Sequence, residues 1–95
     1  MAAYIVFIKE REHSSAAMAD YAAKAGASIG GHSAKPLAYY GAIETLEGPE
    51  AQGAVIIEFP TVDEARAWYQ SDAYQEARQT RFQGGDYRVF ITQGL

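Results

Sequence analysis

Two side chains in this sequence could move a proton near neutral pH. Glu58 stands near the end of the apolar run 55–59, and a carboxylate withdrawn from water has a raised pKa that suits proton transfer. His32, between Gly31 and Ser33, titrates in the physiological range. Both residues are therefore candidate catalytic bases. The alternatives are that Glu58 pairs with an arginine or with helix-start N–H groups, and that His32 is a solvated loop residue.

Aromatic residues are more numerous than a small core requires. Tyr40, Trp68 and Tyr69 are the candidate ligand-binding residues. Together they could line a slot that is apolar with a few polar points, which suits a flat small organic molecule. Ordinary packing in the core or at an interface is the alternative explanation for the same residues.

The sequence lacks the residues that several other kinds of chemistry require. There is no cysteine, so disulfides, thiolate catalysis and zinc–thiolate sites are excluded. No phosphate-binding glycine loop and no metal-ligand spacing occurs, so we expect neither a metal nor a cofactor. Haem binding would need an axial ligand to the iron from His13 or His32, and no feature of the sequence favours either histidine for that role.

Charge and hydropathy also limit the partners. Eight Lys and Arg stand against twelve Asp and Glu, a net charge of −4, which disfavours nucleic acid. The apolar run 2–8 is too short to cross a bilayer. These features predict a cytoplasmic protein without membrane or nucleic-acid partners.

The hydrophobic pattern predicts six elements. Strands are expected at about 4–8, 37–46, 55–59 and 87–92, with a charged wet turn after the first. One helix begins at Ser14 or Ser15, and a second begins after Thr61, three residues before Glu64. The second helix should break near Ser71, which can cap a new segment.

The order β-α-β-β-α-β is that of the ferredoxin-like fold, so residues 1–95 should form one α+β domain with a four-stranded antiparallel sheet. Helices would cover one face of this sheet, yet the strands are apolar on both faces. A monomer rarely exposes so large an apolar patch. We therefore expect a homodimer that packs sheet against sheet.

This topology groups loops from distant parts of the chain. Glu58, the loop with His32 and the start of the second helix should meet at one end of the sheet. At the other end, Glu47 could pair with Arg81 or Arg88 as a structural clamp or as an anion-binding residue, and we expect the clamp.

Three segments carry a resemblance to a known family. Residues 55–61, 65–69 and 71–75 (VIIEFPT, ARAWY and SDAYQ) resemble the bacterial domain-of-unknown-function family 1330. The resemblance implies a dimeric α+β barrel built from two ferredoxin-like subunits. The family has no assigned function, and its fold relatives include cofactor-free monooxygenases, muconolactone isomerases and haem-binding enzymes, which is weak support for any one chemistry.

The functional expectation is a small organic ligand in a pocket between sheet and helices. As an enzyme the protein would be a cofactor-free isomerase or monooxygenase. The alternative is a non-catalytic dimeric module for binding or assembly.

Overall fold

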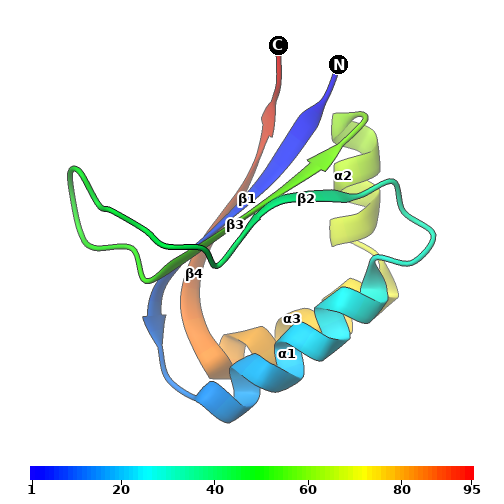
Figure 1. Cartoon of the computed structure of the whole chain (residues 1–95). Helices are drawn as coiled ribbons and strands as arrows, with labels where there is room; N and C mark the ends of the chain where they lie inside the picture. Colours follow the sequence, from blue (N-terminus) through cyan, green and yellow to red (C-terminus); the bar gives the residue numbers. More distant parts are fainter.

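The computed structural model describes all 95 residues and shows one sheet covered by helices on one side (Figure 1). The elements in chain order are β1 (Ala3–Glu12), α1 (Ser15–Ser28), β2 (Lys35–Tyr39), β3 (Gly53–Phe59), α2 (Val62–Tyr69), α3 (Asp72–Gly84) and β4 (Gly85–Gln93).

The four strands form an antiparallel sheet in the order β2-β3-β1-β4. At its centre Ile5 lies opposite Ile57 of β3 and Ile91 of β4. Each helical connection crosses over one intervening strand, which is the arrangement of the ferredoxin-like fold. The predicted fold class is therefore confirmed.

Hydroxyl side chains set the starts of all three helices. The Ser14 Oγ accepts the N–H of Ala17 at 3.1 Å, and the Thr61 Oγ1 accepts that of Glu64 at 3.1 Å. Ser71 separates α2 from α3: its Oγ accepts the N–H of Tyr74 and donates to the Trp68 carbonyl at 2.7 Å. These caps satisfy helix-end groups that would otherwise lack hydrogen-bond partners. The predicted helix starts and the predicted break between the last two helices are therefore confirmed.

Two strand boundaries differ from the prediction. The charged segment after residue 8 does not form a turn but continues β1 to Glu12, because β4 begins at Gly85 and supplies backbone partners. The second strand ends at Tyr39 rather than at residue 46. Tyr40 has a φ of +51°, which turns the chain out of the sheet, and residues 41–50 form an exposed loop.

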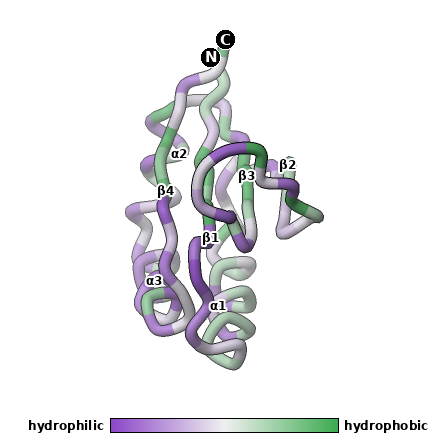
Figure 2. Tube along the Cα trace, turned by 90° about the vertical axis from the view of Figure 1, so that its left-hand side faces the viewer, coloured by the Kyte–Doolittle hydropathy of each residue, from purple (hydrophilic) through white to green (hydrophobic).

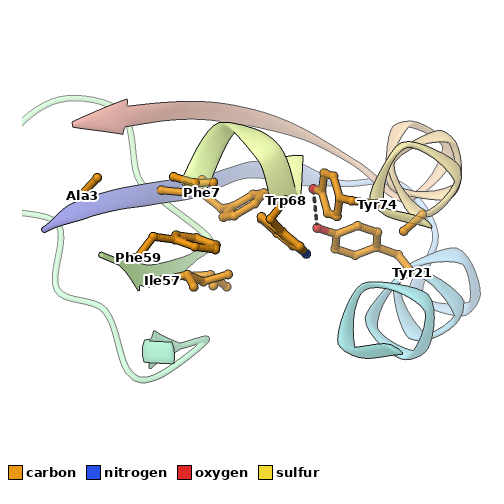
Figure 3. Packing of buried hydrophobic residues seen from close by; sticks show 11 residues of the cluster. Ala3, Phe7, Tyr21, Ile57, Phe59, Trp68 and Tyr74 are labelled. Carbon is orange, nitrogen blue, oxygen red and sulfur yellow. Dashed lines mark hydrogen bonds between the residues drawn. The ribbon is translucent and has the colours of Figure 1, made fainter. Parts of the chain in front are cut away.

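The core lies between the sheet and the helices (Figure 3). Alternate residues of β1 and β3 point into it, and the helices contribute one tryptophan, two tyrosines and two alanines. The core residues are Ala3, Ile5, Phe7, Val55, Ile57, Phe59, Tyr21, Ala65, Trp68, Tyr74 and Ala77.

No helix covers the other side of the sheet, which faces the viewer in Figure 2. We call it the open face. By strand alternation and register it carries Tyr4, Val6, Ile8, Ala54, Ile56, Glu58, Arg88, Phe90 and Thr92. Five of these nine residues are aliphatic or phenylalanine, so the predicted apolar character holds for its centre.

None of the helices has the length and hydrophobicity needed to cross a bilayer.

Candidate functional site

A cavity of about 250 Å³ lies between α1 and the β2–β3 hairpin. Ten of its twelve lining residues are hydrophobic, and five are aromatic. The lining residues are Phe7, Tyr21, Ala22, Ala25, Gly26, Ile29, Pro36, Tyr39, Tyr40, Val55, Ile57 and Trp68.

The cavity exists because three of the residues that line it from α1 are small. Ala22, Ala25 and Gly26 line it without filling it. Trp68 closes one end from α2: its indole N–H donates to the Ser28 Oγ at 3.1 Å, and that hydroxyl donates to the Ala25 carbonyl at 2.6 Å. This chain of hydrogen bonds fixes the indole against α1.

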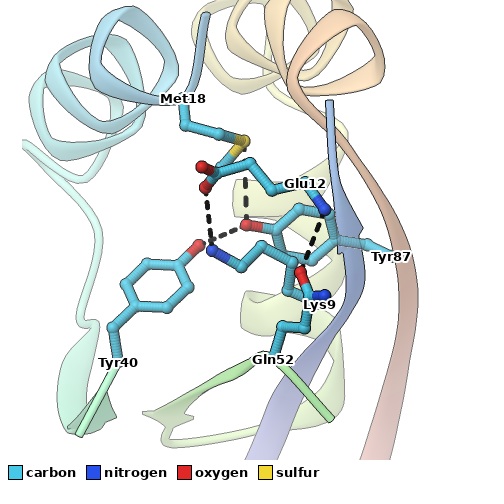
Figure 4. Close-up of polar contacts among 6 residues, drawn as sticks. All are labelled: Lys9, Glu12, Met18, Tyr40, Gln52 and Tyr87. Carbon is cyan, nitrogen blue, oxygen red and sulfur yellow. Dashed lines mark hydrogen bonds and ion pairs between the residues drawn. The ribbon is translucent and has the colours of Figure 1, made fainter. Parts of the chain in front are cut away.

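Tyr40 forms part of the opposite wall through a strained backbone position. Its ring lies close to Gly53, where a Cβ atom would stand only 2.8 Å from the Tyr40 Cδ1. The Tyr40 hydroxyl is 2.6 Å from that of Tyr87, and the Tyr87 hydroxyl is 4.0 Å from the Met18 Sδ (Figure 4). The left-handed turn at Tyr40 thus lets its hydroxyl reach β4, the opposite edge strand, on the helix-covered side of the sheet.

A second tyrosine pair joins the helices. The Tyr21 hydroxyl on α1 is 2.8 Å from the Tyr74 hydroxyl on α3 (Figure 3). The Nη1 of Arg81 donates to the Tyr74 hydroxyl at 3.4 Å. The guanidinium carbon of Arg81 also lies 5.2 Å from the centre of the Tyr87 ring, so this one arginine contacts both tyrosine pairs.

Removal from water raises the pKa of all four paired tyrosines. It raises the pKa of Tyr74 to about 12, and it moves the pKa values of Tyr21, Tyr40 and Tyr87 above the ordinary value as well. Arg81 acts in the opposite direction on each of them. At neutral pH these hydroxyls are therefore uncharged groups that can donate and accept hydrogen bonds.

The structure places two of the five predicted site residues at the cavity. Tyr40 and Trp68 line it. Tyr69 instead packs on Tyr74, with ring centres 5.1 Å apart, and its hydroxyl accepts from the Arg78 Nη1 at 3.2 Å.

The two candidate bases lie elsewhere. Glu58 belongs to the open face, opposite Tyr4 and Lys35 in the strand register, and its carboxylate has no hydrogen bond or ion pair within the chain. His32 follows α1, and its backbone N–H donates to the Ile29 carbonyl at 3.0 Å. No carboxylate and no imidazole lines the cavity.

The sequence did not indicate that Tyr21, Tyr87 and Arg81 meet beside the cavity. The expected clamp is also wrong, because Glu47 is exposed in the loop 41–50, Arg88 lies 3.9 Å from Glu10, and Arg81 has no carboxylate partner. One signal for a buried arginine was available in the sequence. Arg81 follows Tyr74 and Ala77 at helical spacing, on the buried face of α3.

Residues 2–95 match the model of a family described as a domain of unknown function, DUF1330. The chain belongs to this family. Solved structures resemble the DUF1330 chain over its whole length. A protein of unknown function from Rhodopseudomonas palustris is 19% identical with a TM-score of 0.76, and the alignment covers 99% of this chain and 82% of that one.

Two further structures share the fold of the DUF1330 chain. One is a dimeric protein of unknown function and ferredoxin-like fold from Bacteroides fragilis: 12% identity, TM-score 0.62, coverage 98% and 95%. The other is a Mycobacterium tuberculosis protein: 15% identity, TM-score 0.56, coverage 99% and 94%. No curated protein matches the chain.

We expect Gly53→Ala to destabilise the protein by about 1–3 kcal/mol, because the new methyl group collides with the Tyr40 ring. Urea unfolding measures this loss. The control Gly41→Ala adds a methyl group in open space and should change the free energy of unfolding by less than about 0.5 kcal/mol. Adding Tyr40→Ala to Gly53→Ala should cost less than the two separate losses; full additivity would contradict the collision.

Stability should fall with rising pH once the pH passes about 10. In the interval between the ordinary tyrosine pKa of 10.0 and the folded-state value of about 12 for Tyr74, the unfolded chain has lost a proton that the folded chain keeps. Under this condition the free energy of unfolding decreases as pH rises. Urea unfolding at a series of alkaline pH values measures the slope. The slope should be smaller in Tyr74→Phe and unchanged in Tyr39→Phe, which removes an exposed hydroxyl; equal slopes in the two variants would contradict this assignment.

Proposed function

We propose that this DUF1330 protein binds a small, flat, mostly apolar organic molecule in the cavity between α1 and the β2–β3 hairpin. The observation that carries the proposal is a partly open apolar cavity of about 250 Å³ with aromatic walls and few polar groups. An apolar cavity of about 150 Å³ is enough to hold benzene. The space therefore suits a molecule of one or two rings.

The shape of the walls supports a planar ligand. Trp68, Tyr39, Tyr40 and Phe7 present aromatic surfaces from α2, the end of β2 and β1. Aromatic faces stack on flat molecules with little loss of side-chain freedom. The tyrosine hydroxyls are the polar points that would orient the ligand.

Binding is better supported than turnover. A cofactor-free isomerase or monooxygenase needs a base near the reacting atoms, and the cavity wall offers neither a carboxylate nor an imidazole. Glu58 and His32 remain candidate bases for such a reaction, but they would act outside this cavity. We therefore propose a ligand-binding function and assign no reaction to the cavity.

Filling the cavity should abolish binding without unfolding the protein. The neutral probe 2-naphthol should raise the melting temperature of the wild type by several degrees in a dose-dependent way, since ligand bound only to the folded state stabilises it. Ala22→Phe places a ring in the cavity and should remove this shift.

The matched control is Ala23→Phe. Ala23 is the exposed neighbour on the same helix and does not line the cavity. It should retain the shift seen in the wild type. Absence of any shift in the wild type, or equal shifts in the two alanine variants, would contradict the proposed site.

We also propose that the protein is a homodimer that buries its open face against the same face of a second copy. Val6, Ile8 and Ile56 lie side by side at the centre of this face, and Phe90 stands 43% exposed beside them. Two sheets can pack face to face at about 10 Å, which would withdraw these side chains from water. The dimeric Bacteroides fragilis protein of the same fold supports the proposal.

Sedimentation or light scattering at micromolar concentration should give twice the mass of one chain. Phe90→Glu should give the mass of a single chain, because the new carboxylate would be buried between the two open faces of the dimer. The helix content should stay unchanged. The control Phe82→Glu changes another exposed phenylalanine, on α3 and away from the open face, and should leave the dimer intact. A wild-type protein with the mass of one chain would contradict the dimer.

A further inference from the structure

A buried cation without an anion lies behind the wall of the cavity. Arg81 is only 4% exposed, and no carboxylate lies within 4.0 Å of its guanidinium. Aromatic rings surround it, with centres 5.7 Å away in Phe7, 5.2 Å in Tyr87 and 5.4 Å in Phe82. These contacts replace only part of the hydration that a buried charge loses, so the arrangement calls for a negative charge nearby.

Hydrogen-bond directions connect this cation to the cavity through Tyr74. An arginine N–H can only donate, so the Tyr74 oxygen accepts from Arg81. The Tyr74 hydroxyl proton is then best used in donating to the Tyr21 oxygen, 2.8 Å away. Under this arrangement the Tyr21 hydroxyl proton has no acceptor within the chain. Tyr21 is a lining residue of the cavity, so a ligand acceptor that reaches its hydroxyl could take this proton.

The Tyr40–Tyr87 pair forms a second connection between Arg81 and the cavity. The Tyr87 ring lies under the guanidinium, and the Tyr87 hydroxyl is 2.6 Å from that of Tyr40, which lines the cavity. The Tyr87 hydroxyl donates to the Met18 sulfur at 4.0 Å, a weak acceptor, and the Lys9 Nζ lies 5.4 Å from the centre of the Tyr40 ring but already has a carboxylate partner. When Tyr87 donates to Tyr40 instead, the Tyr40 hydroxyl proton is free for a ligand. Two tyrosines that line the cavity are thus linked through hydroxyl pairs to one positive charge.

The smaller hollow that Arg81 also borders is a poorer place for an anion. Asp86 lines that hollow, and its carboxylate is already engaged by the His13 Nε2 at 3.1 Å. A second negative group there would face the Asp86 carboxylate at close range. The apolar cavity carries no such charge.

We infer that the ligand of the cavity is an aromatic carboxylate, whose carboxylate accepts hydrogen bonds from Tyr21 and Tyr40 and is balanced by the charge of Arg81 behind them. This inference rests on the proposed function, because it needs the cavity to bind a flat organic molecule. A single negative charge matches the single buried cation, and the ring system occupies the apolar remainder. Arg81 acts here as a positioning residue through the tyrosines.

The test compares two ligands that differ only in charge. Calorimetric titration of the full chain with 2-naphthoate and with its neutral isostere 2-naphthamide should show the acid binding about tenfold more tightly or better, as charge-assisted hydrogen bonds do. Tyr21→Phe should reduce this preference several-fold. Arg81→Met should abolish or reverse it while 2-naphthamide still binds.

Arg78→Met is the matched control. Arg78 lies one turn earlier on the same helix and also donates to a tyrosine hydroxyl, that of Tyr69, but it is remote from the cavity lining. It should keep the wild-type preference for the acid.

The outcomes separate the two proposals. If 2-naphthol and 2-naphthamide bind but 2-naphthoate binds no better, the carboxylate assignment is wrong and the cavity function stands. If no naphthalene compound binds, both proposals fall. If Arg81→Met does not fold, the test uses the ratio of the affinity for 2-naphthoate to the affinity for 2-naphthamide in the wild type and in Tyr21→Phe. The same ratio in both proteins would overturn the inference.

Discussion

The packing of three aromatic side chains between the helices and the sheet determines most of this structure. The Trp68 ring centre lies 5.7 Å from that of Phe59 below it and 4.3 Å from that of Tyr74 beside it. These rings are too large to let α1 settle directly on β2 and β3. Since three of the residues that line the cavity from α1 are alanine or glycine, a space remains between this helix and the hairpin. The same side chains that complete the core therefore create the cavity.

Much of the fold could be predicted from local chemistry. Ser14, Thr61 and Ser71 each precede a helical apolar pattern, and each caps a helix in the structure. The strand order follows from the alternation of strands and helices. The end of β2 could not be predicted, because the pattern of apolar residues continues beyond it. The turn at Tyr40 depends on a contact with Gly53, which is distant in the sequence, and no local pattern reports such a contact.

The site was less predictable than the fold, for two physical reasons. Glu58 alternates with Ile57 and Phe59, both of which face the helices, so strand geometry alone places it on the opposite side of the sheet. That consequence can be drawn from the sequence. The meeting of Tyr21, Tyr40, Tyr74 and Tyr87 around Arg81 cannot, because it joins α1, α3, β4 and the end of β2 through side-chain reach.

The protein's only tryptophan, Trp68, lines the cavity. Trp68 is 1% exposed, and its indole N–H is held by Ser28. Its emission in the native state therefore comes from a single indole in a single apolar environment. A molecule that entered the cavity would contact this indole, so its fluorescence would report occupancy, and a screen of candidate ligands would require neither a label nor an enzymatic assay.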